Sequence, residues 1–226
     1  MRDDIRKASM TDRGSSDEPT KGWRGSREVW LAAARDAFVT SGIDAVKIQP
    51  LATRLGLSRT SFYWFFEDRA QLLQALLDDW RDTNTSRLVD ATDGFAQSIT
   101  EAVLNVIGVF LPGGGFEAGL DLAVRGWAHQ SDAVAEAVNL EDETRLSAIR
   151  QMFARFGFDP DEADVRARTM YLVQIGYISM QVQEDIPVRL ARISNYVKTF
   201  TGEQPTSAEI ERFLARVWNG AVPALR

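Results

Sequence analysis

Apolar residues recur along this chain at the three- and four-residue spacing of helices that bury one face, and no stretch shows the strong alternation of a half-buried strand. Stretches rich in glycine, proline and polar residues separate the helical segments. The segments predicted as helices are residues 26–40, 48–55, 58–66, 69–88, 95–111, 116–130, 133–138, 140–156, 162–183, 188–200 and 206–218. The pattern therefore predicts an all-α fold.

Two short helices joined by a tight turn are predicted around Gly56. Leu51, Ala52 and Leu55 share one side of the first helix, as a buried stripe requires. Gly56 stands where a helix end favours a left-handed residue, and Ser58 can cap the next helix by accepting a backbone N–H. Two helices at a steep angle, the second with donors near its N-terminal end, form the arrangement that enters the major groove of DNA.

The second of these helices has an apolar face and a polar face. Phe62 and Phe66 are predicted to point inward. The side chains left to face outward or sideways are Arg59, Thr60, Ser61, Tyr63 and Trp64. Arg59 can bond a guanine bidentately, and Tyr63 and Trp64 suit a phosphate oxygen, a thymine methyl group or a sugar. The alternative for Tyr63 and Trp64 is half-buried packing.

Several further helix ends carry their own signals. Asp68 and Gln71 have the spacing of a capping box, so a helix is predicted from residue 69 to about residue 88. That helix joins the two halves of the chain. Thr206 and Glu209 form a second capping box before the last helix. Residues 162–183 are apolar on nearly all sides, which predicts a central helix.

The N-terminal third of the chain resembles the DNA-binding domain of the TetR-type transcriptional regulators. The residues that match that domain are Ala33, Ala34, Phe38, Gly42, Ala52, Gly56, Ser58, Tyr63, Phe66, Arg69, Leu72 and Leu73. The resemblance covers about residues 26–80. It implies a helix-turn-helix DNA-binding domain over residues 26–70 and a helical ligand-binding and dimerisation domain over residues 71–226.

The resemblance also implies contacts to double-stranded DNA. Lys47 stands where the family usually has a small hydroxyl cap and can reach a phosphate instead. Arg69 resembles the family's basic phosphate contact, whereas Phe65 replaces a histidine that usually touches phosphate. The candidate DNA-binding residues are Lys47, Gln49, Ser58, Arg59, Thr60, Ser61, Tyr63, Trp64 and Arg69.

Family members dimerise through their last two long helices, which here correspond to residues 162–183 and 206–218. The candidate interface residues are Phe213, Leu214, Val217 and Trp218. The alternative is that these side chains belong to the core of a single chain. A homodimer predicts an operator that is an inverted repeat, because each copy reads one half-site.

The remaining half of the chain resembles a helical cage for an unidentified small-molecule effector. Gln174 and Gln181 lie two turns apart on one face of the predicted central helix, and a buried amide needs hydrogen-bond partners that a ligand can supply. The candidate effector-binding residues are Trp127, Phe153, Tyr171, Gln174, Tyr177 and Gln181. Neighbouring side chains or an interface can satisfy the amides instead. His129, the sole histidine, is predicted to be a helix-end or packing residue.

The charge of the chain is unevenly distributed. The 226 residues carry a net charge of -6, but residues 21–80 hold eight basic and seven acidic side chains. Phosphate binding needs a local basic face rather than a basic protein, so this distribution permits DNA binding. Residues 1–25 lack a periodic apolar face and are predicted to be a disordered tail. Lys21, Arg24 and Arg27 could place that tail in a minor groove, although a solvated tail is the simpler interpretation.

Composition disfavours other classes of protein. The chain has no cysteine, no apolar signal at its N-terminus and no apolar run long enough to cross a bilayer, so we expect a cytoplasmic protein without membrane contact. The acids at residues 141–143 and 159–162 are explained by capping and solvation, and the glycines at residues 113–115 lack a following Lys-Ser or Lys-Thr. We therefore expect no enzyme, cofactor, metal site or catalytic residue.

The sequence predicts a ligand-responsive transcriptional regulator, a repressor or, less often, an activator, that binds DNA as a homodimer and is released by its effector. The alternatives are an effector-independent DNA-binding or architectural protein and, less favoured, a helical enzyme.

Overall fold

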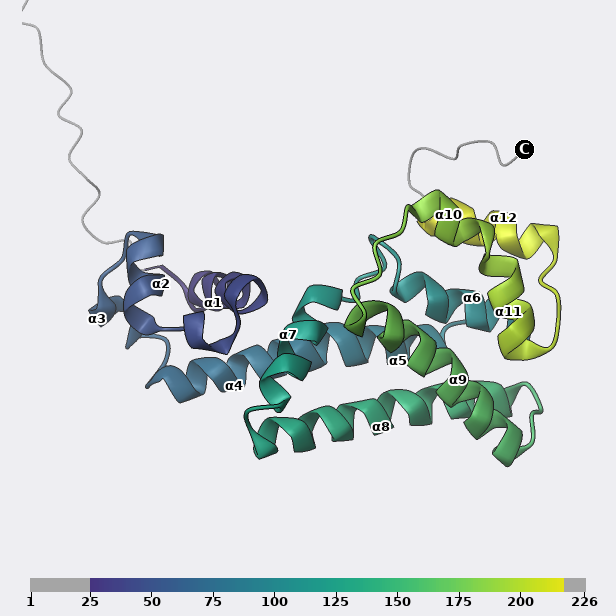
Figure 1. Cartoon of the computed structure of the whole chain (residues 1–226), viewed down its shortest axis with the longest axis horizontal. Coiled ribbons are helices and arrows are strands. Elements are labelled where there is room, and N and C mark those ends of the chain that lie inside the picture. The colour runs from purple at the N-terminus through teal and green to yellow at the C-terminus, as the bar shows by residue number, and fades with distance from the viewer. Residues whose placement is uncertain (1–24, 218–226) are drawn as a thin grey trace, which may run out of the picture.

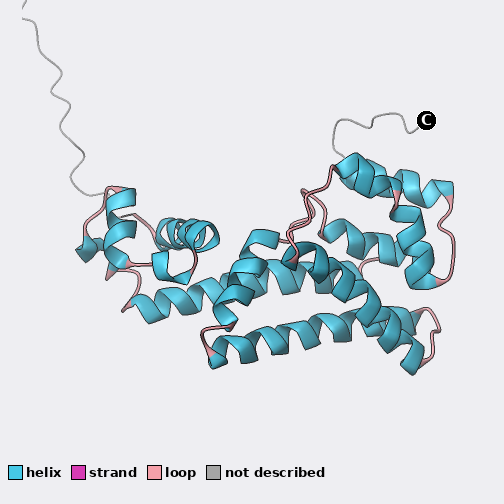
Figure 2. Ribbon diagram, in the orientation of Figure 1, coloured by secondary structure: helices cyan, strands magenta, loops and turns pink. Residues whose placement is uncertain are grey.

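The computed structural model describes residues 25–217, and every regular element in that range is helical (Figure 2). The α-helices are α1 (Arg27–Ser41), α2 (Ile48–Leu55), α3 (Arg59–Phe62), α4 (Arg69–Trp80), α5 (Ser86–Asp93), α6 (Ile99–Val109), α7 (Ala118–Ala128), α8 (Asp132–Arg155), α9 (Pro160–Ser179), α10 (Ile186–Ala191), α11 (Ile193–Thr201) and α12 (Ser207–Val217). A 3₁₀ turn, η1 (Ile43–Ala45), follows α1, and a π-helical turn, η2 (Arg81–Thr85), joins α4 to α5. The predicted all-α fold is confirmed. Trp218 and all but the last residue of the predicted tail lie outside the described range.

The helices α1, α2 and α3 form one end of the molecule (Figure 1). A rod made of α4, η2 and α5 leads away from them without a break. α8 packs against α7, α9 and α5, while α11 and α12 pack on α6 at the far end. The rod therefore connects the end that carries the helix-turn-helix to the end that carries α6 and α12.

The capping signals of the helix-turn-helix are confirmed. Gly56 ends α2 in the left-handed conformation, with φ 65° and ψ 26°. Ser58 Oγ accepts from the backbone N–H of Ser61 at 3.2 Å. Asp68 Oδ1 accepts from the backbone N–H of Gln71 at 2.8 Å. These local bonds fix where α2 ends and where α3 and α4 begin.

Gly56→Ala is expected to lower the free energy of unfolding by about 1 kcal/mol. A Cβ at Gly56 meets no atom within 4 Å, so only the left-handed backbone opposes the substitution. Urea unfolding checks the value. The control is Gly126→Ala in α7, where a Cβ also meets nothing within 4 Å but the backbone is helical. In Gly126→Ala the free energy of unfolding is expected to rise by about 0.5–1 kcal/mol. Equal changes in the free energy of unfolding for the two substitutions would contradict the prediction.

The rod extends the predicted helix of residues 69–88 through the end of α5 and contains the π-helical turn η2. Asn84 and Thr85 in this turn are buried. The Asn84 side chain accepts from the backbone N–H of Glu117 at 2.9 Å and donates to its carbonyl at 3.3 Å. Thr85 Oγ1 accepts from Arg145 Nε at 2.9 Å. π-Helical turns are rare and occur often at functional sites; this one holds the rod to α7 and α8 through polar side chains.

Two clusters of buried apolar side chains hold the helices together. The first, called the reader core, consists of Trp30, Ala33, Ala34, Phe38, Ile43, Val46, Leu51, Ala52, Phe62, Phe66, Leu72, Ala75, Leu76, Leu77, Trp80, Leu120, Val124, Val134 and Val138. The second, called the distal core, lies among α5, α6, α8, α9, α11 and α12. The reader core includes side chains from α7 and α8, so it extends well past residue 70. The predicted domain boundary at that residue stays a prediction.

α8 corrects the prediction of two helices over residues 133–138 and 140–156, because it is one helix of 24 residues. Its buried face includes Glu141 and Arg145, which interrupt the apolar stripe in the sequence. Both are tolerated inside because Glu141 pairs with Arg81 and Arg145 pairs with Asp121. The predicted break near residue 139 is therefore absent, and α8 continues through it.

α9 corrects the prediction of a helix buried on nearly all sides. Val165 and Leu172 on α9 are 63% and 59% exposed, so one side of the helix faces solvent in the single chain. α9 ends at Ser179, and Gln181 lies beyond that end, exposed and with a φ of 49°. Gln181 is therefore not a buried amide on the same face as Gln174.

The predicted capping box at the start of α12 is confirmed and has further partners. The backbone N–H of Glu209 donates to Thr206 Oγ1 at 3.3 Å, and the backbone N–H of Thr206 donates to Glu209 Oε2 at 2.6 Å. Glu209 Oε1 also accepts from Ser98 Oγ and, at 2.9 Å, from Thr100 Oγ1. These bonds attach the start of α12 to the start of α6.

Glu209→Gln is expected to lower the free energy of unfolding by about 2 kcal/mol at pH 7. Burial by itself would raise the pKa of Glu209, but the hydrogen bonds from Ser98, Thr206 and Thr100 lower it from 4.5 to about 2. The folded pKa lies below the unfolded one, so this stabilisation is complete above about pH 5 and is lost as the pH falls toward 2.

Urea unfolding at pH 7 and pH 3 checks this expectation. The difference in stability between the native chain and Glu209→Gln should be smaller at pH 3. Glu203→Gln is the control, because Glu203 is exposed and its carboxylate has no partner among the described residues. A difference that does not change with pH would show that the carboxylate is not the stabilising group.

Candidate nucleic-acid interface

The helix-turn-helix presents an exposed polar face at the end of the molecule. Lys47 precedes α2, Gln49 lies in its first turn, and Arg59 and Thr60 begin α3. Tyr63 follows the last residue of α3. All five are exposed, as predicted for residues that read DNA.

Aromatic packing fixes the direction of α3, which is only four residues long. The Phe62 ring lies edge-on to Trp30, with 5.2 Å between centroids, and stacks on Phe66 at 5.4 Å. The guanidinium of Arg27 lies 5.2 Å from the centroid of Phe66. Both phenylalanines are buried, as predicted, so the side of α3 that carries Arg59 is held toward solvent.

Tyr63 and Trp64 are exposed over 51% and 63% of their surfaces. Tyr63 contacts the edge of Phe62 at 5.4 Å between centroids, so its ring is braced while much of it remains accessible. Both residues directly follow the end of α3. Their contact with DNA stays a prediction.

The basic side chains of this region fall into two groups. Arg35 and Arg54 form ion pairs with carboxylates inside the protein. The side chains of Lys47 and Arg59 have no ion pair or hydrogen bond with another residue in the described part of the chain. A solvent-facing cation without a partner is available to a phosphate or to a base edge.

Arg69 is directed toward the protein backbone. Its Nε donates to the carbonyl of Val46 at 2.5 Å, and its Nη2 donates to the carbonyl of Ile43 at 2.9 Å. The side chain thus ties the start of α4 to the turn before α2. A phosphate contact through its remaining nitrogen stays a prediction.

Ser61 corrects the prediction of an outward-facing residue. It is 5% exposed, and its hydroxyl donates to the carbonyl of Ser58 at 2.7 Å. Serine hydroxyls inside helices often bond the preceding turn in this way. Ser58 itself is exposed and serves as the cap of α3.

Two of the predicted effector residues, Trp127 and Phe153, lie in different parts of the structure. Trp127 packs edge-on against Phe38 at 5.9 Å, beside the reader core. Phe153 packs against Phe158 at 5.3 Å in the distal core. These two candidates therefore belong to different hydrophobic clusters.

The polar candidates on α9 are satisfied by neighbouring side chains. Gln174 Oε1 accepts from Arg189 Nη2 at 2.9 Å, and the hydroxyls of Tyr177 and Tyr196 lie 2.8 Å apart. The alternative that protein groups satisfy the buried amide therefore holds for Gln174. A role for these residues in effector binding stays a prediction.

The candidate dimer residues on α12 mostly face their own chain. Phe213 is 1% exposed and belongs to the distal core, so it is not available to a second copy. Leu214 and Val217 are partly buried against the same core. Their contribution to a dimer interface stays a prediction, and Trp218 lies outside the described residues.

A buried network of charges that the sequence analysis missed links the rod to α7 and α8. Asp121 is fully buried. Its Oδ1 accepts from Trp80 Nε1 at 2.8 Å and from Arg145 Nη1 at 3.1 Å, and its Oδ2 accepts from Arg125 Nε at 2.7 Å. Burial alone would raise the pKa of Asp121, but the charges of Arg125 and Arg145 lower it below its ordinary value. Asp121 is therefore a buried anion between two cations.

The network continues to α9 through Tyr171. The Tyr171 hydroxyl donates to Asp142 Oδ1 at 2.6 Å and accepts from Arg145 Nη1 at 3.1 Å. Burial raises the pKa of Tyr171. The interpretation of residues 141–143 as a solvated run of acids is wrong for Glu141, which is buried and bonds Arg81, and for Asp142, which bonds Arg125 and Tyr171. The available signal was the helical spacing of Asp121 to Arg125 and of Asp142 to Arg145.

Metal binding and membrane insertion were also considered for the described residues. Among residues 25–217, no cluster of three or more His, Cys, Asp or Glu side chains is placed to hold a metal ion. The helices of the same range include none that combines the length and the apolar character needed to cross a membrane. His129 is the C-cap of α7 and is exposed, as predicted for a helix-end residue.

The sequence of the helix-turn-helix matches a known family. Residues 31–76 fit the model of bacterial regulatory proteins of the tetR family. The HTH-type transcriptional regulator TtgR of Pseudomonas putida is 35% identical over 54 residues, which make up 24% of this chain and 26% of TtgR. The match therefore spans about a quarter of that relative's length.

Solved structures share the fold over most of the chain. AmtR of Mycobacterium smegmatis aligns with a TM-score of 0.58 and 19% identity, covering 88% of this chain and 97% of AmtR. GusR of Salmonella enterica aligns with a TM-score of 0.55 and 14% identity, covering 84% and 92%. A transcriptional regulator from Rhodococcus sp. Rha1 aligns with a TM-score of 0.54 and 20% identity, covering 85% and 97%. The helix-turn-helix thus matches the model of the tetR family of bacterial regulatory proteins, and the chain beyond it shares the fold of these solved structures.

Proposed function

We propose that this protein is a transcriptional repressor that binds an inverted-repeat operator as a homodimer and is released by a small-molecule effector. The observation that carries the proposal is the exposed start of α3, where Arg59 faces solvent without a partner among the described residues. A cation held outward on a helix-turn-helix has the geometry for base recognition in a major groove. We propose that the protein has no catalytic activity and works in the cytoplasm.

In the proposed complex, Arg59 bonds a guanine edge and Thr60 lies beside it. Lys47 and Tyr63 contact phosphates on either side, and Trp64 packs on a sugar or a thymine methyl group. Because Ser61 is buried, it acts on DNA only through the position it gives to α3. Specificity then depends on few side chains, so two copies are needed for useful affinity.

The exposed side of α9 supports the proposed homodimer. Val165 and Leu172 are separated by seven residues and so lie on one face, where both are more than half exposed. A second copy of α9 packed against this face would bury them. The proposed interface is therefore centred on α9, and α12 contributes Leu214 and Val217.

The proposed response to an effector uses the rod. A ligand that binds at the end of the rod near α6 and α12 can change the direction of α4. The distance between the two helix-turn-helix units of the dimer then changes as well. The ligand shifts DNA affinity only by as much as it prefers one arrangement of the rod over the other.

Selection of bound sequences from a random pool of duplex DNA tests the proposed function. The expected result is an inverted repeat whose half-sites lie about 34 Å apart, or a multiple of that distance. Sedimentation at micromolar concentration is expected to show a dimer. Recovery of no enriched sequence, or sedimentation only as a monomer of 25.2 kDa, would contradict the proposal.

A further inference from the structure

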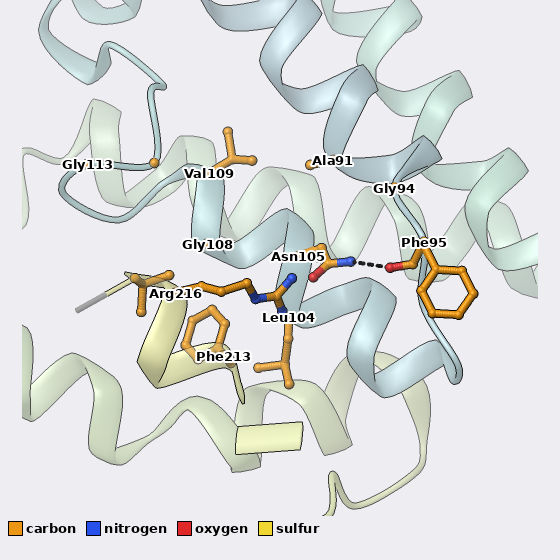
Figure 3. A pocket seen from close by; sticks show the side chains of 12 residues that line it. Ala91, Gly94, Phe95, Leu104, Asn105, Gly108, Val109, Gly113, Phe213 and Arg216 are labelled. Atoms are coloured by element: carbon orange, nitrogen blue, oxygen red, sulfur yellow. Dashed lines mark hydrogen bonds between the residues drawn. The ribbon is translucent and has the colours of Figure 1, made fainter. Parts of the chain in front are cut away.

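A cavity of about 460 Å³ lies where α5, α6 and α12 meet the loop that follows α6 (Figure 3). This volume falls within the range of pockets that bind small molecules. The cavity is lined by none of the six residues that the sequence analysis nominated for an effector.

The walls of the cavity are mostly apolar. Ala91 comes from the rod, Leu104 and Val109 from α6, and Phe213 and Val217 from α12. Phe95 stands at the rim and is 84% exposed. An apolar ligand body would therefore find apolar contacts on three sides, and it could bury a large ring that the chain alone leaves in water.

Two glycines give the cavity a closely packed frame. A Cβ at Gly108 would lie 3.3 Å from the Phe213 ring and 3.4 Å from Val217, so α6 and α12 approach each other closely at this point. A Cβ at Gly114 would lie 2.1 Å from the carbonyl oxygen of Gly108, which no side chain could tolerate. The loop is thus pressed onto the end of α6, and the cavity lies between well-packed elements.

Asn105 offers an unused acceptor in this cavity. Its Nδ2 donates to the carbonyl of Phe95 at 3.3 Å. Its Oδ1 is buried and has no hydrogen-bond partner among the described residues. A buried acceptor without a donor is unfavourable, so an N–H or O–H group from a ligand would satisfy it.

Arg216 offers an unused cation beside Asn105. Its side chain extends from α12 across the cavity toward Asn105 (Figure 3). The guanidinium of Arg216 has no ion pair or hydrogen bond with another described residue, although its charge helps to lower the pKa of Glu101. The Glu101 carboxylate itself bonds Arg212 at 3.1 Å and the backbone N–H of Gln97 at 2.9 Å.

We propose that this cavity binds a small amphipathic organic anion that also carries a hydrogen-bond donor. The apolar body lies between Ala91 and Phe213, the acidic group pairs with Arg216, and the donor bonds Asn105 Oδ1. Because Ala91 belongs to the rod, the bound anion touches the element that leads to the helix-turn-helix. The regulatory part of this inference rests on the proposed function, whereas the binding part does not.

Two dyes with the same ring body provide the first test. Anilinonaphthalene sulfonate has an apolar body, an N–H donor and a sulfonate, and phenylnaphthylamine has the same body and N–H without the charge. Fluorescence titration and calorimetry of the full chain are expected to show one saturable sulfonate site per chain. Arg216→Ala is expected to weaken the sulfonate dye at least about tenfold and to leave the neutral dye unchanged, because only the charged hydrogen bonds are removed.

Further variants separate this site from general surface adsorption. Ala91→Phe is expected to weaken both dyes by filling the cavity. Lys198→Ala removes an exposed cation on α11 outside the cavity and is expected to change neither dye. Thermal unfolding of each variant confirms that it is folded. Equal sulfonate affinity in the native chain, Arg216→Ala and Ala91→Phe would overturn the proposed site.

DNA binding is measured separately with the operator recovered from the random pool. Saturating sulfonate dye is expected to weaken operator binding by the native chain but not by Arg216→Ala. Dye binding without any change in operator affinity would refute the regulatory role of the cavity. Absence of DNA binding in every sample would contradict the proposed function, and the dye titrations would still decide the site.

Discussion

Arg59→Ala is expected to weaken binding of the dimer to its operator by at least about 30-fold. A bidentate contact between arginine and guanine contributes about 1–3 kcal/mol of discrimination, and two copies double that amount to about 2 kcal/mol or more. Arg59 has no partner among the described residues, so its loss removes no intramolecular bond and stability should stay within about 0.5 kcal/mol. Mobility shift on the selected operator measures the affinity, and urea unfolding measures the stability.

Two companion variants make the experiment decisive. Arg59→Lys keeps the charge but loses the bidentate geometry, so it should remain nearly as weak as Arg59→Ala if the contact is to a base. Recovery of affinity in Arg59→Lys would assign the contact to a phosphate instead. Lys198→Ala removes one positive charge far from the helix-turn-helix and should bind normally. Native affinity in Arg59→Ala would refute the proposed reading of DNA by α3.

Asp121→Ala is expected to lower the free energy of unfolding by about 3–5 kcal/mol, a large part of the stability of a typical domain. The substitution leaves the guanidinium of Arg145 buried without its carboxylate and removes the partner of Trp80 Nε1. Arg145 Nη2 already lacks a partner among the described residues, so the remaining bonds cannot compensate. Urea unfolding at pH 7, followed by circular dichroism, measures the loss.

The loss of stability in Asp121→Ala should depend on whether the positive charge of Arg145 is still present. The double variant Asp121→Leu with Arg145→Met removes both charges and should recover much of the stability, because an apolar replacement of a buried pair is often neutral. Asp164→Ala breaks a more exposed set of ion pairs with Arg150 and Arg168 and should cost less than about 1 kcal/mol.

The pH dependence follows from the lowered pKa of Asp121. A carboxylate whose pKa is lower in the folded state stabilises the fold above its unfolded pKa, and this stabilisation disappears as the pH falls through the folded value. The difference in free energy of unfolding between the native chain and Asp121→Ala should therefore become smaller at acidic pH. A gap of constant size would mean that the charge of Asp121 does not stabilise the fold.

Features fixed by short-range geometry were predictable from the sequence. Gly56, Ser58 and Asp68 act within one turn of their helix ends, so residue type and spacing were sufficient to place them. The inward direction of Phe62 and Phe66 followed from helical spacing for the same reason. The outward position of Arg59 then followed from the orientation of the other face.

Features fixed by distant partners were not predictable in this way. The position of Arg69 in the sequence did not predict its hydrogen bonds to the carbonyls of Ile43 and Val46, because these residues lie more than 20 positions away. Glu141 was explained by capping and solvation and Arg145 had no predicted partner, whereas in the structure the rod and α7 supply their partners. The cavity likewise depends on α5, α6 and α12 meeting, which no local pattern encodes.

The extent of the reader core has a consequence for transplanting this DNA-binding module. Leu120 and Val124 on α7 are buried together with side chains of α1 and α4. A fragment cut at the end of α4 would leave that apolar surface uncovered, so it is expected to be poorly folded or prone to self-association. Chimaeras should therefore exchange α1 to α4 together with the α7 surface that covers the reader core.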